Sequence, residues 1–151
     1  MTFNGSPIKE FSYLVTARDI KRFAQAIGDT NPLYQIADDD PSNGAKRMIA
    51  PPLFCQAMAF QDVPLEDLPD DLSPAELAIS VPGLRSVGGA SHYEFYQYVH
   101  AGDNIRIRSC IESVTEKQGR TGLLFLVSVT TCFTNQLGEP VAKEVATYVK
   151  R

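Results

Sequence analysis

Three side chains that could take part in acid–base chemistry lie close together near the end of the first fifth of the chain: Asp29, Asn31 and Tyr34. A carboxyl group and a second titratable group within reach of a reacting atom can serve as general base and general acid. Tyr34 is a poor proton shuttle at neutral pH, because a phenol has a reference pKa near ~10. The run Gly28-Asp-Thr-Asn-Pro32 is also typical of a helix end followed by a turn. These residues alone therefore allow a chemical and a purely structural interpretation.

The other candidates for chemistry are two histidines and three cysteines. His92 and His100 lie far along the chain, which favours a surface or strand-end position for each. The alternative is that one of them approaches a ligand pocket from the sheet. Cys55, Cys110 and Cys132 have no CxxC spacing and lie among apolar neighbours, which favours buried, unreactive thiols. We therefore expect no metal site.

Length, composition and charge indicate one ordinary globular domain. The chain has 151 residues, 44% apolar and 21% charged, so residues 1–151 are expected to form a single domain with its own core. Its 14 Lys and Arg against 18 Asp and Glu give a net charge of −4, which argues against a nucleic-acid partner. No apolar stretch reaches the ~18 residues of a membrane span, and no secretory leader is visible. A cytoplasmic location is expected.

Two helices are predicted in the first half of the chain. Thr16 and Asp19 form a capping-box pattern before apolar residues at helical spacing, so an amphipathic helix is expected over residues 17–27. Gly28 stands where a left-handed C-terminal cap is needed. A second helix is expected to begin at Pro51-Pro52, because proline is favoured in a first helical turn. The residues that follow carry almost no charge, which predicts a helix buried on nearly all sides.

Alternating apolar and polar residues predict an antiparallel meander in the last third of the chain. Its strands are expected over residues 105–112, 125–134 and 141–149, with turns at 118–122 and 135–138. Strands that are segregated from the helices make an α+β domain.

Two further strands are expected, over residues 11–15 and 92–99. The second would carry Tyr93, Tyr96 and Tyr98 as partly buried sheet aromatics. Residues 62–89 combine prolines and glycines with leucines, an isoleucine and a valine, so we expect an ordered covering loop there.

Several short segments carry a resemblance to a known family. In chain order they are Phe23-Ala-Gln-Ala-Ile-Gly-Asp-Thr-Asn-Pro-Leu-Tyr34, Ile49-Ala-Pro-Pro-Leu-Phe54, His92-Tyr-Glu-Phe-Tyr96, Ala101-Gly-Asp103 and Glu116-Lys-Gln-Gly-Arg120. Together they resemble the N-terminal-type MaoC-like dehydratases, a family that includes FAS1-like dehydratases and (R)-specific enoyl-CoA hydratases. The resemblance covers essentially the whole chain. It implies a hotdog fold, an antiparallel sheet wrapped around a long central helix.

Catalytic members of that family hydrate trans-2-enoyl thioesters of CoA or acyl carrier protein, or run the reverse dehydration, with a D-x-N-P-x-H motif. Asp29, Asn31 and Pro32 match this motif, but Tyr34 stands at the histidine position. The family's donor to the thioester oxygen is a backbone N–H at the start of the central helix, usually that of a glycine. Pro52 stands at that place here, and proline has no N–H. The resemblance therefore implies a degenerate site.

Members with these replacements look like the non-catalytic half of a two-hotdog unit. The first hypothesis is a substrate-binding subunit of a heteromeric (R)-specific enoyl-CoA hydratase or 3-hydroxyacyl-thioester dehydratase of fatty-acid or steroid-side-chain metabolism. A second hotdog subunit, in a heterodimer or heterotetramer, would supply the intact Asp and His. The substrate-binding candidates are Pro52, Phe54 and Met58 for the acyl chain, and Lys46 and Arg47 for CoA phosphates or a carrier protein. No cofactor is expected beyond the CoA or acyl carrier protein that carries the substrate.

Two alternatives stay open. One is a self-sufficient homodimeric hydratase that uses Asp29 with an unusual partner such as Tyr34 or His92. The other is an acyl-CoA-binding hotdog module without chemistry. A hotdog thioesterase is disfavoured, because such enzymes usually place an Asp or Glu on the central helix and residues 53–61 contain none.

Overall fold

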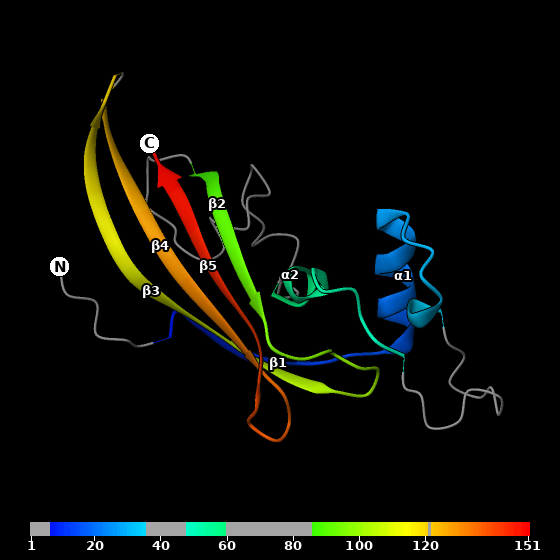
Figure 1. Cartoon of the computed structure of the whole chain (residues 1–151). Helices are drawn as coiled ribbons and strands as arrows, with labels where there is room; N and C mark the ends of the chain where they lie inside the picture. The colour runs from blue at the N-terminus through cyan, green and yellow to red at the C-terminus, as the bar shows by residue number, and fades with distance from the viewer. Residues whose placement is uncertain (1–6, 36–47, 60–85, 121) are drawn as a thin grey trace, which may run out of the picture.

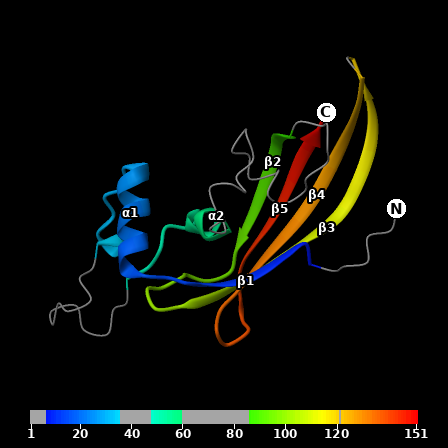
Figure 2. The same ribbon diagram turned by 180° about the vertical axis from the view of Figure 1, so that it is seen from behind.

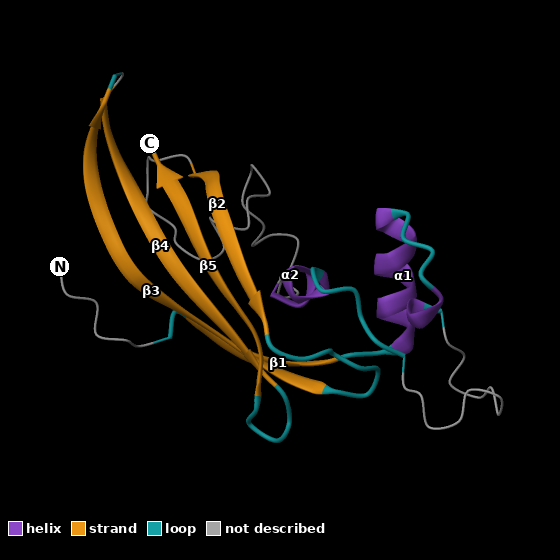
Figure 3. Cartoon of the chain, in the orientation of Figure 1, coloured by secondary structure: helices purple, strands orange, loops and turns teal. Residues whose placement is uncertain are grey.

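The computed structural model describes residues 7–35, 48–59, 86–120 and 122–151. Its elements are β1 (Lys9–Leu14), α1 (Ala17–Ile27), the 3-10 helix η1 (Pro32–Tyr34), α2 (Phe54–Ala59), β2 (Ser86–Phe95), β3 (Asn104–Gly119), β4 (Gly122–Thr134) and β5 (Pro140–Lys150) (Figures 1 and 3). The helices precede strands β2 to β5 in the chain, which confirms the α+β class.

The strands of the described residues form one antiparallel sheet in the order β1-β3-β4-β5-β2. Strands β1 and β2 therefore lie at its two edges. The sheet is curved, α2 lies on its concave side, and α1 stands farther out beyond α2 (Figures 1 and 2). This is the arrangement of a hotdog fold. Of the predicted long central helix, the structure describes the six residues of α2.

Helix α1 is delimited by its own sequence. The Asp19 amide donates to the Thr16 hydroxyl at 3.1 Å, and the Thr16 amide donates to the Asp19 carboxylate at 3.3 Å. Two groups at the helix start are thereby satisfied. Gly28 ends the helix with φ of 71°, in the left-handed region that glycine adopts without a steric penalty. The predicted range 17–27 and both caps are confirmed.

The core lies between the concave face of the sheet and the helices. Alternate residues of each strand point to this face, because side chains in a strand alternate with a period of two. In β3 the inward residues include Ile105 and Ile107, and neither exposes any surface. The Phe54 ring of α2 meets the rings of Phe23 and Tyr13 edge-on, at centroid distances of 5.5 Å and 6.2 Å. Phe54 thus joins α1, α2 and β1 in one packed cluster.

The edge strand β2 was predicted at the wrong place. It spans Ser86–Phe95, so it begins within the predicted covering loop and ends before the last residues of the predicted strand over 92–99. Pairing with β5 decides these limits, since Phe95 pairs with Ala142 and Ser86 with Lys150. The remainder of the predicted loop, up to residue 85, lies outside the described residues, as does the turn-rich segment 38–44.

Other boundaries also differ from the prediction. Strand β1 covers Lys9–Leu14 instead of 11–15, and α2 begins at Phe54, because Pro51 to Leu53 lead into the helix as a turn. Strands β3 and β4 extend beyond their alternating parts and meet at the predicted turn, where Gly119 pairs with Gly122. The turn after β4 is confirmed: the Gly138 amide donates to the Asn135 carbonyl at 2.9 Å.

Several predictions of burial were wrong. Tyr96 and Tyr98 are 50% and 66% exposed, because the chain leaves the sheet after Phe95 and carries them to the surface. Cys55 is buried as expected, but Cys110 is half-buried and Cys132 is exposed on the outer face of β4. Helix α2 is not buried on all sides, since Leu53 before it is 49% exposed and Gln56 within it is exposed.

Candidate functional site

The motif residues lie in the turn that follows α1, and their acceptor atoms bind backbone amides within that turn. Asp29 Oδ1 accepts a hydrogen bond from the Asn31 amide at 2.9 Å, and Asn31 Oδ1 accepts one from the Leu33 amide at 3.0 Å. Such bonds to an amide two residues onward define Asx turns. The Tyr34 side chain is only 8% exposed and belongs to the core. The structure therefore brings the predicted residues together, and the hydrogen bonds of Asp29 and Asn31 stabilise the turn itself.

Backbone hydrogen bonds place this turn next to the start of α2. The Ile49 amide donates to the Leu33 carbonyl at 3.3 Å, and the Ala50 amide donates to the Val99 carbonyl at 2.8 Å. The Ala101 amide donates in turn to the Met48 carbonyl at 2.9 Å. Three segments distant in sequence, residues 31–34, 48–50 and 99–101, thus lie side by side.

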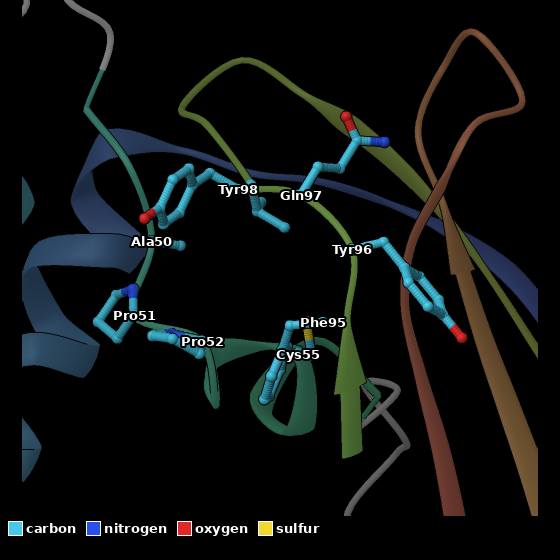
Figure 4. A pocket seen from close by; sticks show the side chains of 9 residues that line it. Ala50, Pro51, Pro52, Cys55, Phe95, Tyr96, Gln97 and Tyr98 are labelled. Atoms are coloured by element: carbon cyan, nitrogen blue, oxygen red, sulfur yellow. The ribbon is translucent and has the colours of Figure 1, made fainter.

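A cavity of about 310 Å³ opens between the start of α2 and the chain that follows β2. The described residues that line it are Ala50, Pro51, Pro52, Cys55, Phe95, Tyr96, Gln97, Tyr98 and Val99 (Figure 4). The Tyr98 ring leans toward Ala50, whereas the Tyr96 ring points away from the hollow (Figure 4). This lining includes no Asp, Glu, His, Lys or Arg, so it suits an apolar ligand better than proton transfer.

The start of α2 offers little for catalysis at this cavity. Pro51 and Pro52 have no N–H, and the Phe54 amide already donates to the Pro51 carbonyl at 2.9 Å. Burial raises the pKa of the Cys55 thiol to about 12, and the nearby charge of Glu144 adds to the rise. Cys55 is therefore an uncharged wall residue at neutral pH.

A half-buried tyrosine and a buried acid form a pair beside the cavity wall. The Tyr93 hydroxyl donates to Glu144 Oε1 at 2.7 Å, across the junction of β2 and β5. Glu144 is only 7% exposed. Burial, the hydrogen bond to Glu144 and the carboxylate charge all raise the pKa of Tyr93. The Phe95 ring stacks on the Tyr93 ring with a centroid distance of 5.8 Å, and Phe95 also lines the cavity.

The other predicted site residues lie in different places. Pro52 lines the cavity, whereas Phe54 and Met58 are 3% and 0% exposed in the core and are not among its lining residues. Their contact with an acyl chain stays a prediction. Lys46 and Arg47 lie outside the described residues.

The two histidines differ in their distance from the motif turn, since His100 pairs with Ile49, whose amide donates to the Leu33 carbonyl of that turn. His92 is exposed on edge strand β2, and His100 lies in the turn before β3, where its amide donates to Asp103 Oδ2 at 2.7 Å. Among the described residues, no three His, Cys, Asp or Glu side chains form a group that could hold a metal ion. In the same part of the chain, no helix is long and apolar enough to cross a membrane.

The family of this chain is shown by a match along nearly its whole length. The model of the FAS1-like dehydratase domain region matches residues 2–144. This chain belongs to that family. The resemblance to MaoC-like dehydratases predicted from the short segments is thereby confirmed.

Related proteins agree with this assignment. The chain is 28% identical to a UPF0336 protein of Streptomyces avermitilis over 144 residues, which are 92% of this chain and 85% of the relative. It is 25% identical to a probable enoyl-CoA hydratase alpha subunit of Thermomonospora curvata, over 83% of this chain and 41% of that protein.

The fold is also found in the crystal structure of the HadBC (3R-hydroxyacyl-ACP dehydratase) complex of Mycobacterium tuberculosis. The TM-score is 0.69 at 22% identity, and the match covers 99% of this chain and 98% of the other. This likeness confirms the hotdog fold.

Sequence reasoning missed the segment after β2 and the Tyr93–Glu144 pair. Residues 95–99 line the cavity because β2 ends at Phe95, and no turn residue in the sequence indicates that end. Glu144 did leave a signal: it follows Ala142 and precedes Ala146 at inward positions of a strand, and a charged residue in such a register is unusual.

Proposed function

We propose that this chain is the substrate-binding, non-catalytic subunit of a heteromeric (R)-specific enoyl-thioester hydratase or 3-hydroxyacyl-thioester dehydratase. One observation carries the proposal: the Asp29 and Asn31 acceptors bind backbone amides of their own turn, and the motif's sixth position is a buried tyrosine. The turn therefore offers Asp29 no second group that readily exchanges protons with water at neutral pH.

The helix start supports the same conclusion. Hydration of an enoyl thioester develops negative charge on the thioester oxygen, and a backbone N–H normally stabilises it. Pro52 cannot supply that donor. The loss of an acid–base residue and of the oxyanion donor in one chain favours reliance on a second subunit for the chemistry.

The cavity supports a role in binding. Its lining is uncharged and mostly apolar among the described residues, as an acyl group requires. At about 30 Å³ for each water-sized group, a volume of 310 Å³ holds on the order of ten such groups. That room suits a medium-length acyl segment.

Features of the sheet edge support a partner. Strand β2 lies at the edge and has exposed apolar side chains, Val87 at 40% and Phe95 at 45%. Exposed edges of this kind are templates for pairing with another chain. A relative whose name includes an alpha subunit, and a similar fold found in a complex, agree with such an assembly.

The test is reconstitution. The purified chain is assayed for hydration of crotonyl-CoA and of longer enoyl-CoA, alone and after co-expression with a hotdog protein from a neighbouring reading frame that carries D-x-N-P-x-H. We expect no turnover alone and turnover in the complex. Asp29→Asn should leave the complex active, whereas the same substitution in the partner's motif should abolish activity.

Two outcomes would overturn the proposal. Turnover by the chain alone that is lost in Asp29→Asn would identify a self-sufficient hydratase. Binding of acyl-CoA without turnover, with every partner that forms a stable complex, would identify a binding module without chemistry.

A further inference from the structure

Helix α1 carries three cationic side chains on its solvent side. Ile20 and Ala24 are buried against the core, so the opposite side of the helix faces solvent. Arg18, Lys21 and Arg22 share that side, because residues three and four apart are neighbours on a helix surface. Arg18 and Arg22 are exposed, and Lys21 is half-buried. We call these three residues the basic face of α1.

The basic face does not stabilise its own helix. Arg18 is followed by the like-charged Lys21 three residues onward and by Arg22 four residues onward, and at both spacings like charges repel. Arg18 also lies in the first turn, where the positive end of the helix dipole disfavours a cation, whereas the last turn has no basic residue. The positions of these charges therefore need an explanation outside the helix.

The acids closest to the basic face in sequence are engaged in the turns at either end of α1. The Asp19 carboxylate accepts a hydrogen bond from the Thr16 amide at 3.3 Å, and Asp29 Oδ1 accepts one from the Asn31 amide at 2.9 Å. The ion pairs found among the described residues lie in other parts of the chain. The basic face is thus a local positive surface on a chain whose net charge is −4.

This surface suits a protein partner better than a phosphate group. Phosphates are usually bound where a concave backbone supplies N–H donors. The basic face is the convex side of a helix, and the Asp19 and Ile20 amides at the helix start already donate to the Thr16 carbonyl. Ile27 and Leu33, at the end of α1 and in the turn after it, are 54% and 44% exposed. A protein that binds α1 would cover this apolar surface as well.

The basic face belongs to a helix that lies next to the cavity. The Phe23 ring of α1 meets the Phe54 ring of α2 at a centroid distance of 5.5 Å, and the ribbon of α1 lies beside Pro51, a lining residue of the cavity (Figure 4). A macromolecule bound to α1 would therefore stand beside the cavity without filling it. From that position a carrier protein can present an acyl group on its flexible arm.

We propose that the basic face of α1 docks an acidic helix of an acyl carrier protein, whose acyl group enters the cavity between α2 and residues 95–99. The substrate class is then a thioester held by a carrier protein, in preference to free acyl-CoA. The inference rests on the proposed function, because it takes the cavity to be the acyl site. Acyl carrier proteins are small, helical and acidic, so complementary charge would steer the carrier to α1 and orient it there.

The test measures binding to the purified chain and, separately, to its complex with the catalytic partner. The titrants are the decanoyl-loaded acyl carrier protein of the same organism and decanoyl-CoA. Arg18→Glu with Arg22→Glu reverses two charges and should weaken binding of the carrier protein at least about tenfold, whereas the affinity for decanoyl-CoA should change by less than about twofold. Raising the salt from about 50 mM to about 300 mM should weaken carrier binding more in the unmodified chain than in this variant.

A control variant makes the same change in total charge at a distant place. Lys117→Glu with Arg120→Glu alters exposed residues at the tip of the β3–β4 hairpin, far from α1 (Figure 1), and should leave the affinity for the carrier protein unchanged. Arg18→Glu alone should also raise the urea midpoint of unfolding, because it removes two repulsive contacts and places an acid in the first turn. A fall in that midpoint would contradict the argument that these charges serve a partner.

The outcomes separate this inference from the proposed function. Carrier binding that is unchanged in the α1 variant, or that falls equally in the control variant, would overturn the inference alone. So would a parallel loss of affinity for decanoyl-CoA, which would identify α1 as a site for CoA phosphates, or binding of decanoyl-CoA without any binding of the carrier protein.

Failure of both titrants to bind the chain and the complex would overturn the proposed function and this inference with it. Circular dichroism checks the fold of each variant. Arg18→Gln with Arg22→Gln, which removes the charges without reversing them, decides the question if the reversed variant does not fold.

Discussion

Two places in this molecule combine a carboxylic acid with a tyrosine, and they differ in how the pair is made. Asp29 and Tyr34 are five residues apart in one turn, and the Asp29 carboxylate binds the Asn31 amide rather than the tyrosine. Glu144 and Tyr93 are fifty-one residues apart, on adjacent strands, and their side chains bind each other at 2.7 Å. Proximity in sequence built a turn in the first case, whereas strand pairing built a side-chain pair in the second.

The first pair can be tested by restoring the two groups that the family motif has and this chain lacks. In Tyr34→His with Pro52→Gly, the histidine and a backbone N–H return to the places they occupy in catalytic relatives. We expect hydration of crotonyl-CoA to rise at least about a hundredfold above the unmodified chain, the lower range for a positioned acid or base. The assay is the loss of enoyl-CoA absorbance.

The matched control for that variant is Tyr34→Phe with Pro52→Gly, which restores the N–H but no titratable group. It should stay at the background rate. If the histidine variant folds and its hydration rate also stays at background, the turn does not hold Asp29 in a position where it can act as a base.

The second pair should contribute more to stability than the first. Tyr93→Phe removes a donor from a buried carboxylate, so the free energy of unfolding is expected to fall by about 2 kcal/mol. Asp29→Asn keeps an oxygen that can accept from the Asn31 amide, so its loss should stay within about 0.5 kcal/mol. Urea denaturation followed by circular dichroism measures both. Equal losses would contradict the distinction between a local turn and a side-chain pair formed by tertiary structure.

The smallest expected effect concerns the glycine before the motif turn. A Cβ at Gly28 or at Gly88 would meet nothing within 4 Å, but Gly28 has φ of 71°, whereas Gly88 in β2 lies outside the left-handed region. Gly28→Ala should therefore cost about 1 kcal/mol through backbone strain. Gly88→Ala should not lower the stability, because alanine is favoured over glycine inside a strand. A loss of the same size for both would show that the left-handed cap does not direct the chain into the motif turn.

The features that sequence predicted well are those that short stretches of chain determine. Thr16, Asp19 and Gly28 set the limits of α1 through bonds to their own neighbours. The alternation of apolar and polar residues located half of β3 and most of β4 and β5, because a half-buried strand must present one face to the core. The motif turn was also readable, since Asp and Asn bind amides two residues onward.

Tertiary structure decided the rest. Strand β2 begins at Ser86 and ends at Phe95 because β5 offers it partners there, and this limit leaves Tyr96 and Tyr98 outside the sheet. The cavity exists only where those residues meet the start of α2, some forty positions earlier in the chain. Glu144 meets Tyr93 only through the register of two strands, and register depends on the whole sheet. Chemistry-bearing groups that lie far apart in sequence are brought together by pairing and packing, so a motif search along the chain could find the turn but not the pair.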